Sequence, residues 1–315
     1  MRPVKLPRRT FPGKSVGTTL GAVLLGLGPL LALAATGDLG LVRVTDRVSL
    51  ITGAGTNVVV LETPDGLALV DSGAPGQAEA LLGFIDETYG GVPIRVLFST
   101  HWHPDHTGAN EAIAERGATI VAHENTRLWM ATEYYVAWEK KNYTPSPDAA
   151  LPTETFYSSY PQPLSYELGG YVIEYGHLPE AHTDGDIYVR FAGDDVIAVG
   201  DVLAVDAFPL FDYSTGGWIG GSQQAMRDLL ELAGPGTTVI ASLGAPQQRA
   251  ALEAQLAMLD DFSERFRIAM NLGKGADEML AEGIIEGYES LPDARRFIHN
   301  TYNGLWWGGR VRGPI

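Results

Sequence analysis

Residues 100–106 constrain this chain more than any other feature of its sequence. They read Thr-His-Trp-His-Pro-Asp-His and bring together three of the seven histidines and one carboxylate. The run directly before them, residues 94–99, is short and apolar, which predicts a buried β-strand. The chain must therefore fold so that a strand delivers clustered imidazole and carboxylate groups, a donor set suited to zinc, iron or manganese.

The spacing within this stretch predicts how its side chains divide. Alternation along an extended turn points His101 and His103 the same way, toward one ion. Asp105 and His106 follow the bend and can face a second ion. A surface loop with chance histidines is the competing interpretation, and the particular spacing argues against it.

The rest of the chain reads as an alternation of strands and helices. Apolar and β-branched runs predict strands at Val48–Thr52, 56–63, 67–71, 94–99, 118–122, 171–175, Ile187–Phe191, 196–199 and 237–241. Helical spacing predicts helices at 76–89, 109–116 and 221–232, followed by three helical segments at the end. Residues 132–165 interrupt the alternation with an aromatic, proline-containing stretch, either a flap over a pocket or an insertion packed on the core. No linker divides residues 35–315, so we expect one domain there.

The 100–106 stretch resembles the His-x-His-x-Asp-His signature of the metallo-β-lactamase superfamily. Three further motifs of that family are present. Residues 181–186 (AHTDGD) contain His182, Asp201 follows an apolar strand, and Asp71 ends an early hairpin strand. The resemblance covers roughly residues 41–244. It implies an α/β fold, the four-layered αββα sandwich, with metals at one edge between the two sheets.

The resemblance also implies a role for each of these residues. A first metal would be held by His101, His103 and His182, a second by Asp105 and His106, and Asp201 would bridge the two. Asp71 would orient a ligand histidine. Zinc is the implied cofactor, and a metal-bound hydroxide formed near neutral pH would attack an ester, thioester, lactone or β-lactam carbonyl. Asp105 would orient that hydroxide or move its proton.

One position departs from the family pattern. The family closes its second site with the histidine of a Gly-His-Gly turn, where this chain has Leu243, and leucine binds no metal. We therefore expect one firmly bound zinc and a weak or absent second ion. A mononuclear iron oxidoreductase resembling the persulfide dioxygenases and a non-catalytic metal-binding protein remain alternatives. Tyr157 and Tyr160 of the aromatic stretch are the predicted substrate contacts.

The N-terminus predicts where the protein works. Residues 1–14 are basic, and residues 15–37 form an uncharged, largely apolar run. Within that run, Ala32 and Ala34 are small residues at the spacing that a signal peptidase needs. Together they predict an export signal at 1–34 and a periplasmic or secreted protein. Arg8 and Arg9 resemble a twin-arginine motif, with an ordinary secretory signal and an uncleaved membrane anchor as alternatives.

The amino-acid composition limits the classes of partner that the protein can bind. The chain has 22 Lys and Arg against 38 Asp and Glu, a formal net charge of −16, which repels phosphate backbones and disfavours nucleic acid. We expect a small-molecule substrate, and membrane contact only through an uncleaved N-terminal segment. The absence of cysteine excludes thiolate ligands and a cysteine nucleophile.

Overall fold

The structure is a computed structural model that describes residues 38–157 and 163–307. The predicted export signal at 1–34 and the predicted contact Tyr160 lie outside the described residues. In the part of the chain that is described, no helix combines the length and the apolar character needed to cross a membrane.

The first sheet has seven strands, in the order β1-β2-β3-β4-β5-β6-β9. Their bounds are β1 Gly40–Arg43, β2 Val48–Thr52, β3 Val58–Thr63, β4 Gly66–Val70, β5 Ile94–Phe98, β6 Thr119–His123 and β9 Glu154–Phe156. The strands from β1 to β4 pair antiparallel, whereas β4, β5, β6 and β9 run parallel. The carboxyl ends of β4, β5 and β6 therefore meet at one edge of the sheet.

The second sheet has six strands, in the order β10-β11-β12-β13-β14-β15. Their bounds are β10 Leu164–Leu168, β11 Tyr171–His177, β12 Ile187–Phe191, β13 Val196–Gly200, β14 Thr238–Ala241 and β15 Gln247–Gln248. A backbone hydrogen bond from Ile187 to the Thr100 carbonyl, 2.9 Å long, joins this sheet to the loop after β5. The two sheets thus meet at the edge where the histidine-rich loop begins.

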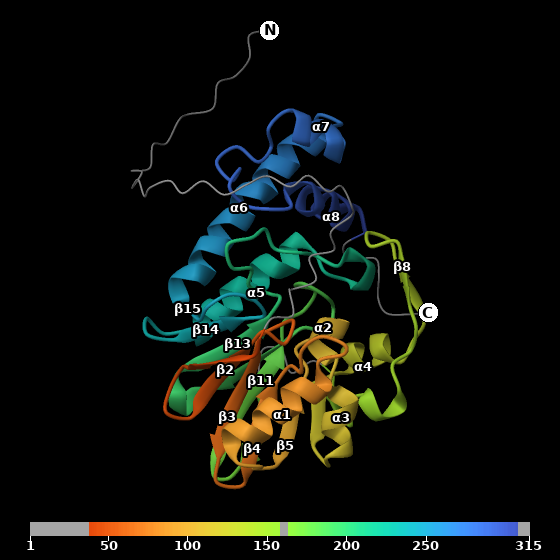
Figure 1. The fold of residues 1–315 in the computed structure, drawn as a ribbon. Coiled ribbons are helices and arrows are strands. Elements are labelled where there is room, and N and C mark those ends of the chain that lie inside the picture. The colour runs from red at the N-terminus through yellow and green to blue at the C-terminus, as the bar shows by residue number, and fades with distance from the viewer. Residues whose placement is uncertain (1–37, 158–162, 308–315) are drawn as a thin grey trace, which may run out of the picture. The chain divides into compact units, whose positions relative to one another are not determined.

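Helices cover the outer faces of both sheets. The α-helices are α1 Ala78–Tyr89, α2 Pro104–Thr107, α3 Asn110–Glu115, α4 Glu124–Met130, α5 Ile219–Leu232, α6 Arg249–Asn271, α7 Ala276–Ala281 and α8 Ala294–Trp307. Helices α1 and α3 lie over the first sheet, and α5 and α6 lie over the second (Figure 1). The predicted strands and helices are all present, with small shifts at their ends.

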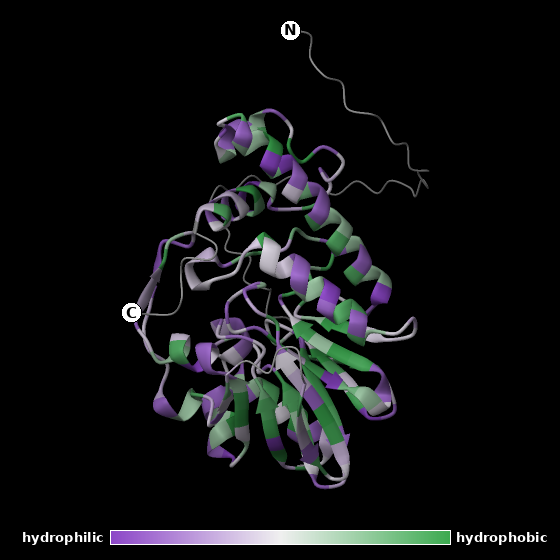
Figure 2. Ribbon diagram, turned by 180° about the vertical axis from the view of Figure 1, so that it is seen from behind, coloured by the Kyte–Doolittle hydropathy of each residue, from purple (hydrophilic) through white to green (hydrophobic). Residues whose placement is uncertain are grey.

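Strand alternation explains the layering. In β4, Leu67 and Leu69 face the helices, while Ala68 and Val70 face the other sheet. In β13, Ile197 and Val199 likewise face α5 and α6, opposite to their neighbours in sequence. Both strands are buried on two sides and are accordingly continuous apolar runs, which Figure 2 shows as green ribbons flanked by helices with purple segments. These layers confirm the predicted four-layered αββα sandwich.

The described part of the aromatic stretch 132–165 contains three strands and the start of a fourth. Strands β7 (Tyr134–Val136) and β8 (Lys141–Tyr143) form a separate two-stranded hairpin. The later strands of the stretch belong to the main sheets, because β9 pairs with β6 and β10 pairs with β11. The β7–β8 hairpin packs on Trp102, which lies between two of the predicted metal ligands.

Candidate metal centre

The loop after β5 carries the first ligands because the strand ends just before it. His103 has an extended backbone and caps α2, whose first residue is Pro104. Proline favours the first position of a helix because its missing N–H would have no partner there. The chain therefore turns sharply after His103 and places Asp105 and His106 on α2, with the centroid of the His106 ring 4.1 Å from that of His101.

Four of the predicted residues meet at one point. Ligand atoms of His101, His103, His182 and Asp201 all lie within 4.8 Å of one another. Nδ1 of His103 lies 3.0 Å from Nε2 of His101 and 2.9 Å from Nε2 of His182. In a tetrahedral zinc site with Zn–N bonds of about 2.0–2.1 Å, neighbouring ligand nitrogens are roughly 3.3 Å apart. The cluster therefore has the size of a metal coordination sphere.

In two of the histidines, the hydrogen bond of the outer ring nitrogen determines whether the inner ring nitrogen carries a proton or a lone pair. Nδ1 of His182 lies 2.7 Å from the Leu210 carbonyl oxygen, so it donates and leaves a lone pair on Nε2. Nε2 of His103 lies 3.3 Å from Oδ2 of the Asp212 carboxylate, so it also donates and leaves a lone pair on Nδ1. These two lone pairs face each other at 2.9 Å, an arrangement that is repulsive unless a cation accepts both.

Asp71 sets the tautomers of the other two histidines. Its carboxylate accepts from the Thr100 backbone N–H at 2.8 Å and the Thr100 hydroxyl at 2.9 Å. Thr100 Oγ1, having given its proton to Asp71, accepts from Nδ1 of His101 at 3.1 Å. Nδ1 of His106 donates to Asp71 Oδ2 at 2.7 Å. Nε2 of both histidines is thus left as a lone pair, and that of His106 is buried with no hydrogen-bond partner in the described structure.

Burial favours the neutral form of two of these imidazoles, those of His101 and His182. Desolvation lowers the pKa of His182, and it lowers the pKa of His101 well below its usual range, with neighbouring histidines adding to the effect. At His103 desolvation acts in the same direction, but the hydrogen bond and charge of Asp212 outweigh it and raise the pKa. Neutral imidazole is the state that binds a metal. The donor set, its spacing and its tautomers all fit a divalent cation.

The loop after β13 places Asp201. Gly200 has a φ of 55°, and a Cβ there would lie 2.6 Å from Thr100 Oγ1, so glycine is required for the close approach of the two sheets. Asp201 Oδ2 lies 3.4 Å from Nε2 of His182, and Oδ1 lies 3.5 Å from Nε2 of His106. The Ser242 hydroxyl donates a hydrogen bond to Oδ1. Asp201 therefore faces both His106 and the first three histidines.

The remaining predicted residues lie outside the four-ligand group. Asp105 is half-buried in α2, its backbone carbonyl accepts from the Thr56 hydroxyl at 2.7 Å, and its carboxylate makes no hydrogen bond within the described residues. Tyr157 is 78% exposed and packs near His123, which is not a member of the group. Leu243 is 49% exposed beside the site.

Sequence reasoning missed Asp212. This carboxylate is fully buried and accepts four hydrogen bonds, from His103 Nε2, Thr215 Oγ1, Trp138 Nε1 and the Ser214 backbone N–H. Burial acts to raise its pKa, but these donors outweigh burial and lower it, so the group is a carboxylate. No sequence pattern marks Asp212. It holds His103 in the tautomer that presents Nδ1.

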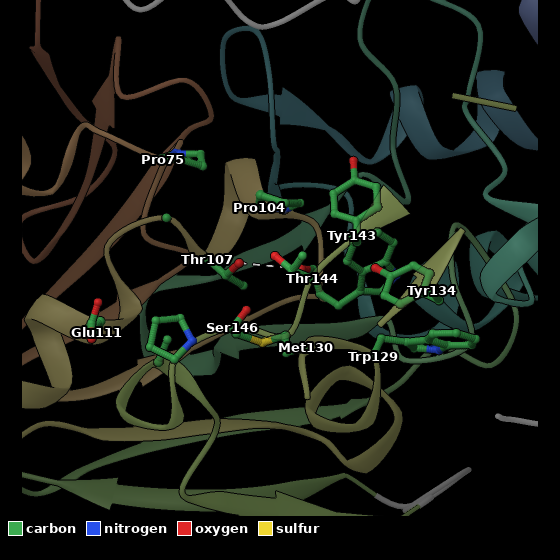
Figure 3. Close-up of a pocket in the computed structure, with 14 residues that line it drawn as sticks. Pro75, Pro104, Thr107, Glu111, Trp129, Met130, Tyr134, Tyr143, Thr144 and Ser146 are labelled. Carbon is green, nitrogen blue, oxygen red and sulfur yellow. Dashed lines mark hydrogen bonds between the residues drawn. The ribbon is translucent and has the colours of Figure 1, made fainter. Parts of the chain in front are cut away.

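Behind the histidine loop lies an aromatic cavity of about 200 Å³. Figure 3 shows Tyr134 and Tyr143 of the β7–β8 hairpin side by side next to Pro104, with Thr107 and Glu111 on the opposite wall. The two tyrosine rings are stacked at 5.5 Å, and each meets Trp102 edge to face at 5.0 Å. The hairpin is therefore anchored to the loop that carries the ligands.

Solved structures with the same fold are metallo-β-lactamases. A metallo-beta-lactamase from Pontibacter korlensis superposes with a TM-score of 0.57 at 21% identity, covering 70% of this chain and 99% of its own. The DIM-1 metallo-beta-lactamase gives 0.57 at 16% identity, covering 71% and 98%. At these identities the likeness establishes the fold. No curated protein matches the chain in sequence.

A match to a family model shows which family the chain belongs to. The model described as the metallo-beta-lactamase superfamily matches residues 51–244, well over half of the chain. The matched range includes the histidine loop, His182 and Asp201 and ends directly after Leu243. The resemblance stated from the motifs is thus confirmed, and the chain belongs to the metallo-beta-lactamase superfamily.

Proposed function

We propose that the protein is a zinc-dependent hydrolase that cleaves an ester, thioester, lactone or β-lactam carbonyl. The observation that carries the proposal is the convergence of imidazole lone pairs and one carboxylate on a single point, with each ring held by a partner on its far side. Such preorganised ligands with oriented second partners are what metal hydrolases use. The superfamily is consistent with this chemistry.

In this proposal four residues bind the metal ion and one residue accepts a proton. His101, His103, His182 and Asp201 would hold the ion, and a zinc ion there supplies Lewis acidity that lowers the pKa of water and polarises a carbonyl. Asp105 would take the proton of the attacking water. Its carboxylate is only half-buried and has no hydrogen-bond partner in the described residues, so it is available for transfer.

A second metal position would be weak or empty. His106 presents an unpartnered Nε2 toward Asp201, and Asp105 lies one residue before it, but no second imidazole among the described residues completes the set. Ser242 is already engaged with Asp201 through its hydroxyl, and Leu243 offers no donor atom. The proposal is therefore a site that works with one ion, since a single zinc suffices to generate the nucleophile.

Substrate and location follow from other features. The acidic surface supports a small-molecule substrate over nucleic acid, and residues 1–34 support action outside the cytoplasm. β-Lactams belong among the test substrates because structures similar in fold include metallo-beta-lactamases. Esters, thioesters and lactones complete the panel because they share the same attacked carbonyl.

The test combines elemental analysis with turnover. The protein is purified without chelator, its zinc and iron per chain are measured, and the panel is assayed before and after metal removal. We expect about one zinc per chain and hydrolysis that is lost with the metal and restored by zinc. His182→Ala should abolish both zinc binding and turnover, whereas Arg267→Ala, which changes an exposed side chain on α6, should change neither.

Three outcomes would contradict the proposal. Two tightly held zinc ions per chain would mean that another group completes the second position. Iron in place of zinc, with oxygen consumption, would assign the protein to the oxidoreductases. Bound zinc without turnover of any panel member would make it a metal-binding protein of the same fold.

A further inference from the structure

A groove of about 470 Å³ lies at the turn after β14. Its walls come from β1, from the loop between β2 and β3, and from residues 243–246, and they include Val42, Thr52, Thr56, Asn57, Leu243 and Pro246. The volume falls within the range of pockets that take small organic ligands, roughly 300–1,000 Å³. The aromatic cavity behind the histidine loop is below that range. Of the two, the groove has the size for a substrate group.

Two contacts join the groove to the metal centre. Thr56 lines the groove and gives its hydroxyl hydrogen to the Asp105 backbone carbonyl at 2.7 Å. Leu243 lines it from the other side and directly follows Ser242, whose hydroxyl bonds Asp201. The groove therefore begins at Thr56, which contacts the proposed proton acceptor Asp105, and at Leu243, which is one residue from the serine that bonds the proposed ligand Asp201.

The groove offers an apolar surface. Leu243 is 49% exposed and Val42 is 41% exposed, both unusually open for aliphatic side chains. Two of its three polar side chains, those of Thr56 and Asn57, already have partners inside the protein. Asn57 Nδ2 donates to the carbonyls of Ala241 and Gly244 at 2.9 and 3.0 Å, and Thr56 is held by Asp105. A ligand there finds hydrophobic contact and few free hydrogen-bonding side chains.

We propose that this groove binds the apolar chain attached to the carbonyl that the enzyme attacks, so that the substrates are long-chain acyl esters, thioesters or lactones. The inference rests on the proposed hydrolase function and extends it to a substrate class. Leu243 takes the family's metal-binding position, and here it supplies apolar surface to the groove instead. The single replacement of the family's histidine by Leu243 then both removes a metal ligand and adds apolar surface to the acyl subsite.

The test measures binding directly, without turnover. The zinc-loaded full chain is titrated by calorimetry with acetate, hexanoate and decanoate, which present the product carboxylate with chains of increasing length. Full burial of one methylene strengthens binding about fourfold, and an open groove should give about half that gain per methylene. Hexanoate should therefore bind at least about tenfold more tightly than acetate.

Two matched variants localise the effect. Leu243→Ser should reduce the ratio of the acetate and hexanoate Kd values by about fivefold, because it removes the exposed isobutyl group. Leu272→Ser, which changes a leucine that is 67% exposed beyond the end of α6, should leave that ratio unchanged. Val42→Ser tests the opposite wall and should act in the same direction as Leu243→Ser.

The outcomes separate the subsite from the hydrolase proposal. Equal Kd values for acetate, hexanoate and decanoate would overturn the subsite, as would a chain-length gain that survives both groove variants. Hydrolysis of short and long esters with equal kcat/KM would also overturn it while the hydrolase proposal stands. A gain in affinity that depends on Leu243, without hydrolysis of any member of the substrate panel, would support the subsite and refute the hydrolase.

Discussion

Replacing Asp212 with asparagine is the sharpest perturbation of this site. The carboxylate accepts on two sides, with His103 and Thr215 on Oδ2 and Trp138 and the Ser214 N–H on Oδ1. Asparagine has one oxygen and one NH2 group, so one of these two donor pairs must face another donor. Because the site is buried, the mismatch cannot be relieved by bulk water.

The orientation of the new amide decides the effect on the metal. If its oxygen faces Trp138 and Ser214, the NH2 group faces His103 Nε2 and favours the tautomer with a proton on Nδ1. That proton sits on the atom that must bind the ion. Removing such a partner of a ligand histidine typically weakens metal binding 10- to 100-fold, or about 1.4–2.7 kcal/mol. We expect Asp212→Asn to raise the zinc Kd within that range.

The assay is a zinc titration of metal-free protein against a competing chelator dye. Trp138→Phe is the matched control, because it removes one donor and leaves the carboxylate on His103, so the zinc Kd should change less than threefold. In Trp138→Phe/Asp212→Asn, the NH2 group has one fewer opposing donor on the Oδ1 side, and part of the affinity should return. Unchanged zinc affinity in Asp212→Asn would refute the reasoning that Asp212 sets the tautomer of His103.

Three more predictions address other parts of the molecule. Leu243→His should add a second, tighter zinc per chain by elemental analysis, and unchanged stoichiometry would show that this turn does not face the metals. Gly217→Ala should destabilise the fold by about 3 kcal/mol in chemical denaturation, because a Cβ there would lie 1.9 Å from the His182 carbonyl oxygen; a normal midpoint would contradict it. Burial and the stacked His177 lower the pKa of His123 to about 3, so the folded protein keeps this ring neutral while the unfolded chain takes up a proton below about pH 6.5. This ring alone should therefore lower the free energy of unfolding by about 1.4 kcal/mol per pH unit from 6.5 toward 3 in metal-free protein. His123→Asn, which retains a helix-capping side chain, should remove that part of the slope in thermal melts.

The features that the sequence predicted are those encoded locally. Strand β4 is a continuous apolar run because it is buried on both faces, and that pattern is visible without the fold. His101 and His103 come directly after the apolar strand β5, so their placement at a sheet edge follows from chain order. The spacing of the family motifs extended the same reasoning to His182 and Asp201. These motifs, interpreted through the resemblance to the family, were enough to predict the members of the four-ligand group.

The features that were missed depend on contacts between distant parts of the chain. Asp212 meets His103 across 109 residues and Trp138 across 74, and nothing near it in sequence signals either contact. Strand β9 has three residues, too few for a period to show, and it exists because β6 offers an open edge. The isolated β7–β8 hairpin is similarly held by aromatic packing on Trp102 and not by its own propensity.

The segment 208–212 connects the metal centre to two other parts of the chain, the β7–β8 hairpin and helix α8. Its Leu210 carbonyl orients His182 and its Asp212 carboxylate orients His103, so two ligands depend on one short segment. The β7–β8 hairpin region contributes Trp138, which donates to Asp212 from one side. The orientation of both histidine ligands therefore depends on how rigidly this segment is held.

Helix α8, which follows the matched range, fixes segment 208–212 from the other side. Asn300 donates to the Phe211 carbonyl at 3.2 Å, and Phe297 stacks on Phe208 at 4.6 Å. If docking of α8 holds the segment in the conformation that presents both ligands, docking raises metal affinity, and by linkage the metal must stabilise docked α8 by the same free energy. The C-terminal helices are then part of what makes the metal centre, although no metal ligand lies on them.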